Sequence, residues 1–298
     1  MMHAPPIGLD ADVLQQWPLP VPADDDDKEA RGRVLILAGG REMPGGAILA
    51  CDAALRAGVG KLTLVTGESV AAGIALAVPE ARVIAMPDDM AAWRDAPVMD
   101  EVLRVACKAH AVLIGPGMPE GIATADVADV LLAHCQHAGV ILDAAAMDTL
   151  IRRKAPLSQP VLVTPHAGEM AHLTGQPKDV VKHDPVQAAS MAARQWGAVV
   201  ALKGACTVIA TPQGRVWRHE GGNVGLAVSG SGDTAAGLMA GLLARGAGLA
   251  QAAAWGVVLH ASAGEQLAQR WGLLGYLARE IPSEVPSLMA RFMPPDTR

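Results

Sequence analysis

The chain has 298 residues, of which 51% are hydrophobic and 18% charged, and its net charge is −6. This length allows a large core and one or two domains, and the composition is that of a globular protein. Aromatic residues make up only 3% and no basic stripe is present, which excludes an ordinary nucleic-acid-binding surface. The first 20 residues lack the basic start and apolar core of a signal peptide, so we expect a cytoplasmic protein.

Two further features exclude a disulfide framework and a membrane span. The four cysteines, at positions 51, 107, 135 and 206, contain no C-x-x-C pair, and we expect them to be buried small apolar residues rather than disulfide partners or zinc ligands. The uncharged run 246–264 holds only five large apolar residues. It therefore indicates a buried core helix, and no contact with a membrane is expected.

The amino-terminal segment differs in composition from the rest of the chain. Residues 1–30 are rich in proline and aspartate, and Asp24–Lys28 resembles either a protease tag site or a natural acidic linker. We expect a mobile or loosely docked arm over residues 1–30 and one domain over residues 31–298.

From residue 34 onward, apolar runs typical of buried strands alternate with helix-like segments. The predicted strands are 34–38, 61–65, 81–85, 111–114, 140–142, 161–163 and 199–202, with a hairpin of 208–210 and 215–217. The predicted helices are 47–57, 99–109, 122–136, 169–173 and 185–196, and the chain beyond residue 233 is helical. This alternation predicts an α/β fold with a mostly parallel sheet between helices.

Glycine or polar residues follow five of the predicted strands, at 39–40, 115–117, 143, 164–166 and 203–204. In a parallel sheet, ligands bind beyond the carboxyl ends of the strands. We therefore expect the chemistry of this protein to converge on one edge of the sheet.

The sequence Gly230-Ser-Gly-Asp233 precedes an apolar helix and is the most informative motif. A helix start offers free N–H groups and a partial positive charge, which suit a phosphate, and an aspartate there can take a proton from a hydroxyl. The motif therefore suggests phosphoryl transfer to an alcohol. The structural alternative is a turn followed by a helix cap.

Three other positions carry open alternatives. Lys203 is either a solvated strand end or part of a nucleotide site with Thr207. In Thr164–Glu169, Thr164 or Gly168 can cap the following helix, which leaves the histidine unexplained. Asp143 is either a contact to a substrate or metal, or a helix cap. His260 lies in a helix interior and is more typical of a satisfied core or interface residue.

No Walker loop and no G-x-G-x-x-G fingerprint follows the first strand, which argues against those nucleotide-binding classes. Instead, six motifs occur together in one order: Gly45–Ala47, Ile114–Gly117, Leu142–Ala144, Thr164–Glu169, Leu202–Thr207 and Gly222–Asp233. Across roughly residues 31–275 the chain thereby resembles the ADP-dependent NAD(P)H-hydrate dehydratase family of the ribokinase-like superfamily.

The resemblance implies a ribokinase-like three-layer αβα fold and a repair reaction. Hydrated NADH or NADPH (NAD(P)HX, S-epimer) is phosphorylated on its ring hydroxyl by ADP, and phosphate is then eliminated to restore NAD(P)H, with release of AMP. By position, Ala47, Gly117, His166 and Asp233 would contact the hydrated cofactor, with Asp233 as the base. The nucleotide would be held by Lys203, Gly204, Ala205, Cys206, Thr207 and Gly232, and the anion hole would include the N–H groups of Ser231, Gly232 and Asp233. Mg²⁺ would bridge phosphates, with no ligand residues assigned.

The resemblance also implies a homotetramer and, because 30 residues cannot encode an epimerase domain, a stand-alone dehydratase that relies on a separate epimerase. Four positions depart from the family pattern: Ala167 and Val224 replace prolines, Val228-Ser-Gly230 replaces Thr-Gly-Gly, and Thr234 replaces an aliphatic residue. We expect these departures to affect loop rigidity rather than the reaction class. The alternatives are a kinase of the same superfamily acting on a vitamin-precursor alcohol, and a non-catalytic nucleotide-binding protein, against which the presence of Asp233 argues.

Overall fold

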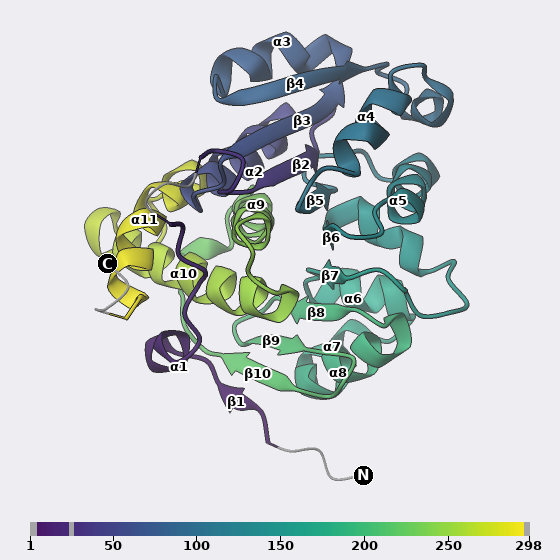
Figure 1. The fold of residues 1–298 in the computed structure, drawn as a ribbon. Helices are drawn as coiled ribbons and strands as arrows, with labels where there is room; N and C mark the ends of the chain where they lie inside the picture. Colours follow the sequence, from purple (N-terminus) through teal and green to yellow (C-terminus); the bar gives the residue numbers. More distant parts are fainter. Residues whose placement is uncertain (1–4, 24–26, 295–298) are drawn as a thin grey trace.

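The computed structural model describes residues 5–23 and 27–294. Its centre is one ten-stranded sheet with the order β1-β10-β9-β8-β7-β6-β5-β2-β3-β4 (Figure 1). The pairings on either side of β9 are antiparallel and the remaining pairings are parallel. The strands are β1 (Ile7–Gly8), β2 (Arg33–Leu37), β3 (Lys61–Gly67), β4 (Ala81–Met86), β5 (Ala111–Ile114), β6 (Gly139–Leu142), β7 (Val161–Val163), β8 (Val199–Leu202), β9 (Thr207–Ala210) and β10 (Val216–His219).

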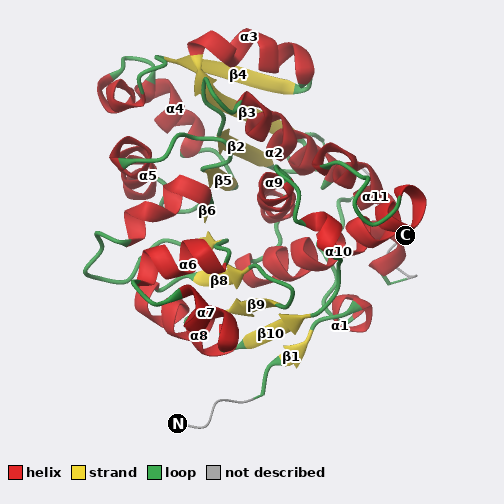
Figure 2. Cartoon of the chain, turned by 180° about the vertical axis from the view of Figure 1, so that it is seen from behind, coloured by secondary structure: helices red, strands yellow, loops and turns green. Residues whose placement is uncertain are grey.

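Helices cover both faces of this sheet, so the molecule has three layers (Figure 2). The α-helices are α1 (Ala11–Gln15), α2 (Pro44–Arg56), α3 (Glu68–Ala77), α4 (Met99–Ala106), α5 (Ile122–His134), α6 (Ala167–Thr174), α7 (Lys178–His183), α8 (Pro185–Trp196), α9 (Ser231–Ala244), α10 (Leu249–Trp271) and α11 (Ile281–Phe292). Short 3₁₀ helices are η1 (Met90–Asp95), η2 (Ala144–Leu150), η3 (Val224–Leu226) and η4 (Ala278–Glu280). No helix of the described ranges combines the length and the apolar character needed to cross a bilayer.

The alternation of side chains along each strand builds two separate cores. In β2, Val34 and Ile36 face the core under α2, α9 and α10, whereas Leu35 and Leu37 face the core under α4, α5 and α8. Because both faces are buried, the strands are continuous apolar runs rather than alternating ones. This arrangement confirms the predicted α/β fold with its mostly parallel sheet.

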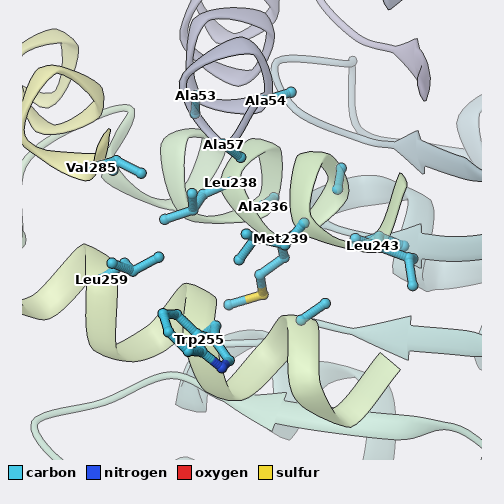
Figure 3. Packing of buried hydrophobic residues seen from close by; sticks show 14 of the residues in the cluster. Ala53, Ala54, Ala57, Ala236, Leu238, Met239, Leu243, Trp255, Leu259 and Val285 are labelled. Atoms are coloured by element: carbon cyan, nitrogen blue, oxygen red, sulfur yellow. The ribbon is translucent and has the colours of Figure 1, made fainter. Parts of the chain in front are cut away.

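The first of these cores is built on a very close approach of α2 and α9 (Figure 3). A Cβ atom on Gly237 would collide with the carbonyl oxygen of Ala50, and one on Gly241 would lie 2.9 Å from the Cα of Ala54. Alanine and glycine therefore let the two helix backbones touch. The consequence for the site is that the amino-terminal ends of α2 and α9 lie next to each other.

The amino-terminal segment is not the loose arm that its composition suggests, at least over residues 7–20. β1 adds a parallel strand to β10, and Leu14 of α1 is completely buried. The Trp17 ring stacks on Trp217 with centroids 5.5 Å apart, and the Trp17 carbonyl accepts a hydrogen bond from the Trp255 indole N–H at 2.8 Å. Apolar burial and the open edge of β10 explain the docking. Residues 24–26 of the acidic linker lie outside the described residues.

Most predicted strands and helices occur within a few residues of their expected positions, and 246–264 lies largely inside the buried helix α10, as predicted. Helices α3 and α7 were not predicted. The cysteine prediction is wrong at two positions, because Cys107 is exposed and Cys206 is half-buried, whereas Cys51 and Cys135 are buried.

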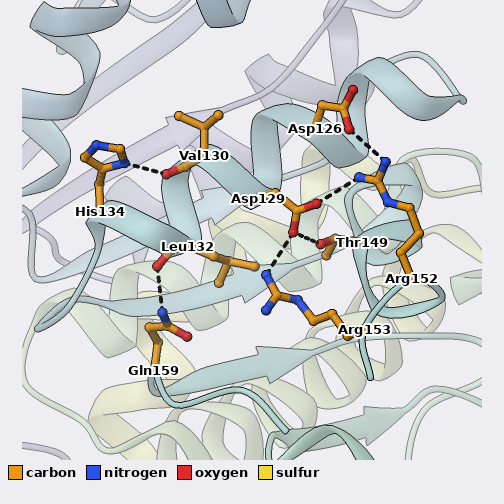
Figure 4. Close-up of polar contacts among 9 residues, drawn as sticks. All are labelled: Asp126, Asp129, Val130, Leu132, His134, Thr149, Arg152, Arg153 and Gln159. Carbon is orange, nitrogen blue, oxygen red and sulfur yellow. Dashed lines mark hydrogen bonds and ion pairs between the residues drawn. The ribbon is translucent and has the colours of Figure 1, made fainter. Parts of the chain in front are cut away.

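Away from the edge where the motifs gather, an ion-pair network ties α5 to the chain that follows η2 (Figure 4). Asp129 accepts from Arg152 and Arg153, each at 2.8 Å, and from the Thr149 hydroxyl. Asp126 adds a second 2.8 Å contact to Arg152. These partly exposed contacts fasten the loop before β7 without reaching the motif residues.

Candidate active site

The Gly230–Asp233 motif forms the start of α9. Gly230 is the residue before the helix and has φ +88°, and no side chain caps the helix start. The N–H group of Ser231 donates to the Val228 carbonyl at 3.2 Å. It is therefore not free to bind an anion, which differs from the predicted anion hole. Among the described residues, the N–H groups of Gly232 and Asp233 have no acceptor. The helix start therefore presents two free donors and its dipole to a ligand.

Asp233 stands beside these donors in the first turn of α9. Burial, together with the negative charges of Asp143 and Glu169, raises the pKa of its carboxyl to about 6, against the opposing effect of Lys203. A carboxylate with this pKa is ionised at neutral pH and is a stronger base than an exposed aspartate. The position of Asp233 thus suits proton abstraction from a bound hydroxyl.

Lys203 reaches the same helix start from the end of β8. Its Nζ atom would be 3.4 Å from a Cβ atom on Gly232, and it lies 3.1 Å from Oδ1 of Asp143. The Asp143 side chain is 4% exposed and that of Lys203 is 23% exposed. Burial lowers the pKa of Lys203, but Asp143, Glu169 and Asp233 raise it more, so the amine remains charged. Lys203 is therefore not a solvated strand end.

Asp143 is held by two donors rather than acting as a helix cap. Thr164 at the end of β7 donates its hydroxyl to Oδ1 of Asp143 at 2.7 Å, which excludes Thr164 as the cap of α6. The side chain of Asp143 makes no capping bond to η2. Three adjacent strands thus contribute one buried polar chain of Thr164, Asp143 and Lys203.

The histidine of the Thr164–Glu169 turn caps α6. Nδ1 of His166 accepts from the N–H groups of Gly168 at 2.9 Å and Glu169 at 3.0 Å, and the Glu169 carboxylate accepts from the His166 N–H at 2.7 Å. Gly168 is therefore not the cap, and the histidine has a structural role that sequence reasoning missed. Because Nδ1 accepts, a neutral His166 carries its proton on Nε2. The backbones of His166 and Lys203 form an isolated parallel β-bridge, so the two side chains start from neighbouring positions.

Ala47 and Gly117 meet at the other side of the same edge. A Cβ atom on Gly46 would lie 2.8 Å from the Cα of Gly117, and Ala47 is buried one residue later in α2. Leu49 of α2 lies against Gly230, which brings this pair next to the start of α9. The predicted contacts of the hydrated ring thus lie at one edge of the sheet.

The loop Gly204–Thr207 connects β8 to β9 beside Lys203. Gly204 and Ala205 are exposed, and the Thr207 hydroxyl lies 3.4 Å from the Gly204 carbonyl. The guanidinium of Arg218 donates to the Cys206 sulfur at 2.9 Å. The open backbone of this loop is accessible to a nucleotide.

His260 of α10 lies directly behind the start of α9. Its Nε2 atom is 3.0 Å from the Ser231 hydroxyl and 3.1 Å from the Ser231 carbonyl. Burial and the charge of Lys203 lower the pKa of His260 to about 4, against the opposing effect of the bond to the Ser231 carbonyl. His260 is half-buried and hydrogen-bonded, which agrees with the predicted satisfied core or interface residue, but its partner is a residue of the site.

Local contacts hold the backbone at three of the four departures from the family pattern. The Thr234 hydroxyl donates to the Gly230 carbonyl at 3.1 Å, which fastens the turn before α9. Asn223 accepts from the Gly225 N–H at 2.9 Å and from the Tyr276 hydroxyl at 2.8 Å, which holds the turn around Val224. Ala167 occupies the first position of α6, which the His166–Glu169 capping box already fixes.

A cavity of about 570 Å³ lies at the opposite edge, near the amino ends of β2, β3 and β4, where Arg33, Lys61 and Arg82 line it. None of the motif residues contributes to it. Chemistry therefore places the candidate site at the carboxyl edge, despite the size of this other cavity.

Comparison with known proteins agrees with this placement. Residues 34–287 match the family described as NAD(P)H-hydrate dehydratase. The chain is 47% identical to the ADP-dependent (S)-NAD(P)H-hydrate dehydratase of Xanthomonas campestris over 285 residues, which cover 94% of this chain and 95% of that protein.

Solved structures give the same relationship. The ADP/ATP-dependent NAD(P)H-hydrate dehydratase of Bacillus subtilis, co-crystallised with ATP and Mg²⁺, aligns with a TM-score of 0.83 and 32% identity over 96% of this chain and 99% of its own. A ribokinase-like superfamily protein of Enterococcus faecalis aligns with a TM-score of 0.84 and 26% identity, covering 97% of each chain. This likeness confirms the predicted ribokinase-like fold.

The kinase alternative has much weaker support. The hydroxyethylthiazole kinase protein of Pyrococcus horikoshii is 16% identical, with a TM-score of 0.58 over 90% of this chain and 91% of its own, which is a likeness of fold alone. The match over residues 34–287 and the 47% identity decide the family. The chain belongs to the NAD(P)H-hydrate dehydratase family.

Proposed function

We propose that this protein repairs hydrated nicotinamide cofactors. It phosphorylates the ring hydroxyl of (S)-NAD(P)HX with ADP and eliminates the phosphate, which yields NAD(P)H, AMP and phosphate. The observation that carries the proposal is the start of α9, where the carboxylate of Asp233 adjoins two free N–H groups and the Lys203 ammonium. A base, an anion site and a fixed cation are the parts that phosphoryl transfer to a hydroxyl requires.

In the first step, Asp233 takes the proton of the ring hydroxyl while the hydroxyl oxygen attacks the β-phosphorus of ADP. The bond between that phosphorus and the bridging oxygen breaks, and AMP leaves with the electron pair. The N–H groups of Gly232 and Asp233 and the charge of Lys203 oppose the negative charge on the transferring group. In the second step, phosphate leaves the ring carbon with the electron pair of the C–O bond. The adjacent ring carbon gives its proton to water, and the electron pair of that C–H bond restores the double bond.

We propose binding roles for residues at the neighbouring strand ends and helix starts. Ala47, Gly117 and His166 would contact the hydrated nicotinamide, and the Nε2 proton of His166 is a donor for it. Lys203, Gly204, Ala205, Cys206, Thr207 and Gly232 would hold the adenine nucleotide. The supporting observations are local. Ala47 and His166 lie at the starts of α2 and α6, and Gly117 packs against Gly46 of α2. Residues 203–207 lead from β8 into β9, and Gly232 precedes Asp233 in the first turn of α9, next to Lys203.

Magnesium would take few ligands from the protein. In residues 5–23 and 27–294, no three His, Cys, Asp or Glu side chains come together as a metal site. Oδ1 of Asp143 already accepts from Thr164 and Lys203. The site therefore fits a Mg²⁺ ion that is held mainly by nucleotide phosphates and water, where it would neutralise phosphate charge.

The deciding experiment incubates the purified protein with hydrated NADPH, Mg²⁺ and either ADP or ATP and follows the NADPH absorbance. Recovery of the absorbance with stoichiometric AMP from ADP supports the proposal. No recovery with either nucleotide would overturn it. Accumulation of a phosphorylated alcohol without elimination would favour the superfamily kinase instead.

We also propose a homo-oligomer, with a tetramer as the expected form. Large apolar side chains are exposed along the loop after α10 and at η3, with Leu274 78% exposed and Trp271, Leu273 and Val224 nearby. Such a patch is typical of a protein interface. Light scattering of Leu274→Asp should show smaller particles than the unchanged protein, and an unchanged mass would contradict this surface. A separate epimerase would supply the S-epimer from the other form.

A further inference from the structure

The tautomer of His260 can be assigned from its contacts with Ser231. A carbonyl oxygen only accepts hydrogen bonds, so the 3.1 Å contact from Nε2 to the Ser231 carbonyl requires a proton on Nε2. The same Nε2–H faces the Ser231 hydroxyl oxygen at 3.0 Å. In this arrangement the hydroxyl oxygen accepts, and its own hydrogen is left to be donated elsewhere.

That hydrogen has no acceptor in the part of the chain that the structure describes. The polar partner of the Ser231 oxygen is His260, and only 5% of the Ser231 residue is exposed. The next two residues are Gly232 and Asp233, whose N–H groups are also unoccupied. A third donor therefore adjoins the two backbone donors at the start of α9.

We propose that His260 is a positioning residue that makes the Ser231 hydroxyl a donor to the transferring phosphoryl group. The assignment rests on the proposed phosphoryl transfer and adds two side chains to it. Because the pKa of His260 is lowered to about 4, the imidazole stays neutral over the working pH range. Its hydrogen bond to Ser231 is therefore kept while Asp233 titrates. The Ser231 N–H, which bonds Val228, contributes nothing to the anion, and the hydroxyl takes its place.

The test compares Ser231→Ala, His260→Phe, His260→Gln and the double variant Ser231→Ala/His260→Phe. Loss of one such donor lowers kcat by about 100-fold, and we expect this for Ser231→Ala and His260→Phe, with KM for ADP changed by less than about threefold. His260→Gln retains an N–H donor and should recover most of the rate. The double variant should be no slower than Ser231→Ala alone, because both changes remove the same contact.

A second readout does not need turnover. AMP with orthovanadate imitates the phosphoryl group in transit, and its binding should weaken in Ser231→Ala and His260→Phe while ADP binding is retained. Ser262→Ala, on the opposite side of α10 from His260, is the matched control and should leave both unchanged. If His260→Phe does not fold, His260→Asn, whose shorter amide does not reach Ser231, replaces it.

The outcomes separate the two proposals. An inactive unchanged protein refutes the repair function, whatever the variants do. An active protein whose Ser231→Ala and His260→Phe variants turn over and bind AMP–vanadate normally refutes the role of His260. Strictly multiplicative losses in the double variant would also refute it, since they would mean that the two residues act independently.

Discussion

Asp143 and Lys203 form a buried ion pair of 3.1 Å although the strands that carry them, β6 and β8, are not neighbours in the sheet. The intervening strand β7 is followed by Thr164, whose hydroxyl donates to the same Asp143 oxygen at 2.7 Å. The three strand ends therefore fix the Lys203 ammonium next to the start of α9.

Removing one member of this pair should cost much stability. In Asp143→Ala the Lys203 charge stays buried without its partner, and we expect the free energy of unfolding to fall by about 3 kcal/mol. The double variant Asp143→Ala/Lys203→Met should recover part of that loss. Urea unfolding monitored by tryptophan fluorescence measures both.

Asp126→Ala is the matched control, because it breaks the partly exposed pair with Arg152 (Figure 4). Such pairs contribute at most about 1 kcal/mol. If Asp143→Ala and Asp126→Ala were equally stable, the buried pair would not hold the strand ends together.

The rate should fall on the acid side as Asp233 becomes protonated. Since its pKa is raised to about 6, kcat/KM should decline as the pH drops through that value. Lys203 lowers the pKa of Asp233 and Asp143 raises it. The acid limb should therefore move to higher pH in Lys203→Met and to lower pH in Asp143→Asn. The pH profiles of residual activity measure these shifts, and movement of both in the same direction would contradict the assignment.

Asp233→Asn should separate activity from stability. We expect turnover to fall by several orders of magnitude while nucleotide binding persists, because the base is lost and the two N–H donors remain. A raised pKa means that the folded state disfavours the ionised carboxyl, so the stability from this group is present below its unfolded pKa and lost as pH rises through about 6.

Asp233→Asn should thus be more stable than the unchanged protein at pH 8, by about 2 kcal/mol. The difference should vanish below about pH 4, where the aspartate is protonated in both states. Thermal unfolding at the two pH values measures it. An active Asp233→Asn variant would show that another group is the base.

The strands and longer helices were predictable because each is a continuous apolar run or a periodic segment bounded by glycine. The segment that contains β1 and α1 was not predictable. These elements have only two and five residues, and their stability comes from contacts with Trp217 and α10 rather than from a local sequence pattern. The convergence of motifs on one sheet edge followed from strand direction. The pairing of Ser231 with His260 did not, because it depends on how α9 and α10 cross.

The contact of α2 and α9 makes a sharp prediction at Gly237. A Cβ atom there would collide with the Ala50 carbonyl oxygen, which belongs to backbone and cannot move aside. Gly237→Ala should therefore destabilise the protein by about 2 kcal/mol or more, as overpacking of a core does. Gly73→Ala in α3 is the control, because its Cβ atom would meet open space and alanine favours the helix. Equal stability of the two variants would contradict the close packing of α2 and α9.

The docked amino-terminal segment should contribute to global stability. Leu14 is completely buried in the core formed with α10 and α11, whereas Val21, directly after the docked segment, is 53% exposed. Leu14→Ala should lower the free energy of unfolding by about 3 kcal/mol, because it leaves a cavity in that core. Val21→Ala should change it by less than about 0.5 kcal/mol.

Chemical denaturation of the full chain measures both variants, and limited proteolysis reports whether the segment itself is released. If Leu14→Ala matched Val21→Ala in stability, the segment would not share the core. If Leu14→Ala left global stability unchanged but exposed residues 7–20 to protease, the segment would open separately from the sheet. We expect Leu14→Ala to lower the global stability and the protease resistance of residues 7–20 together. The reason is that the Trp17 carbonyl accepts hydrogen bonds from two side chains of α10, the Trp255 indole at 2.8 Å and the Gln251 amide at 3.1 Å.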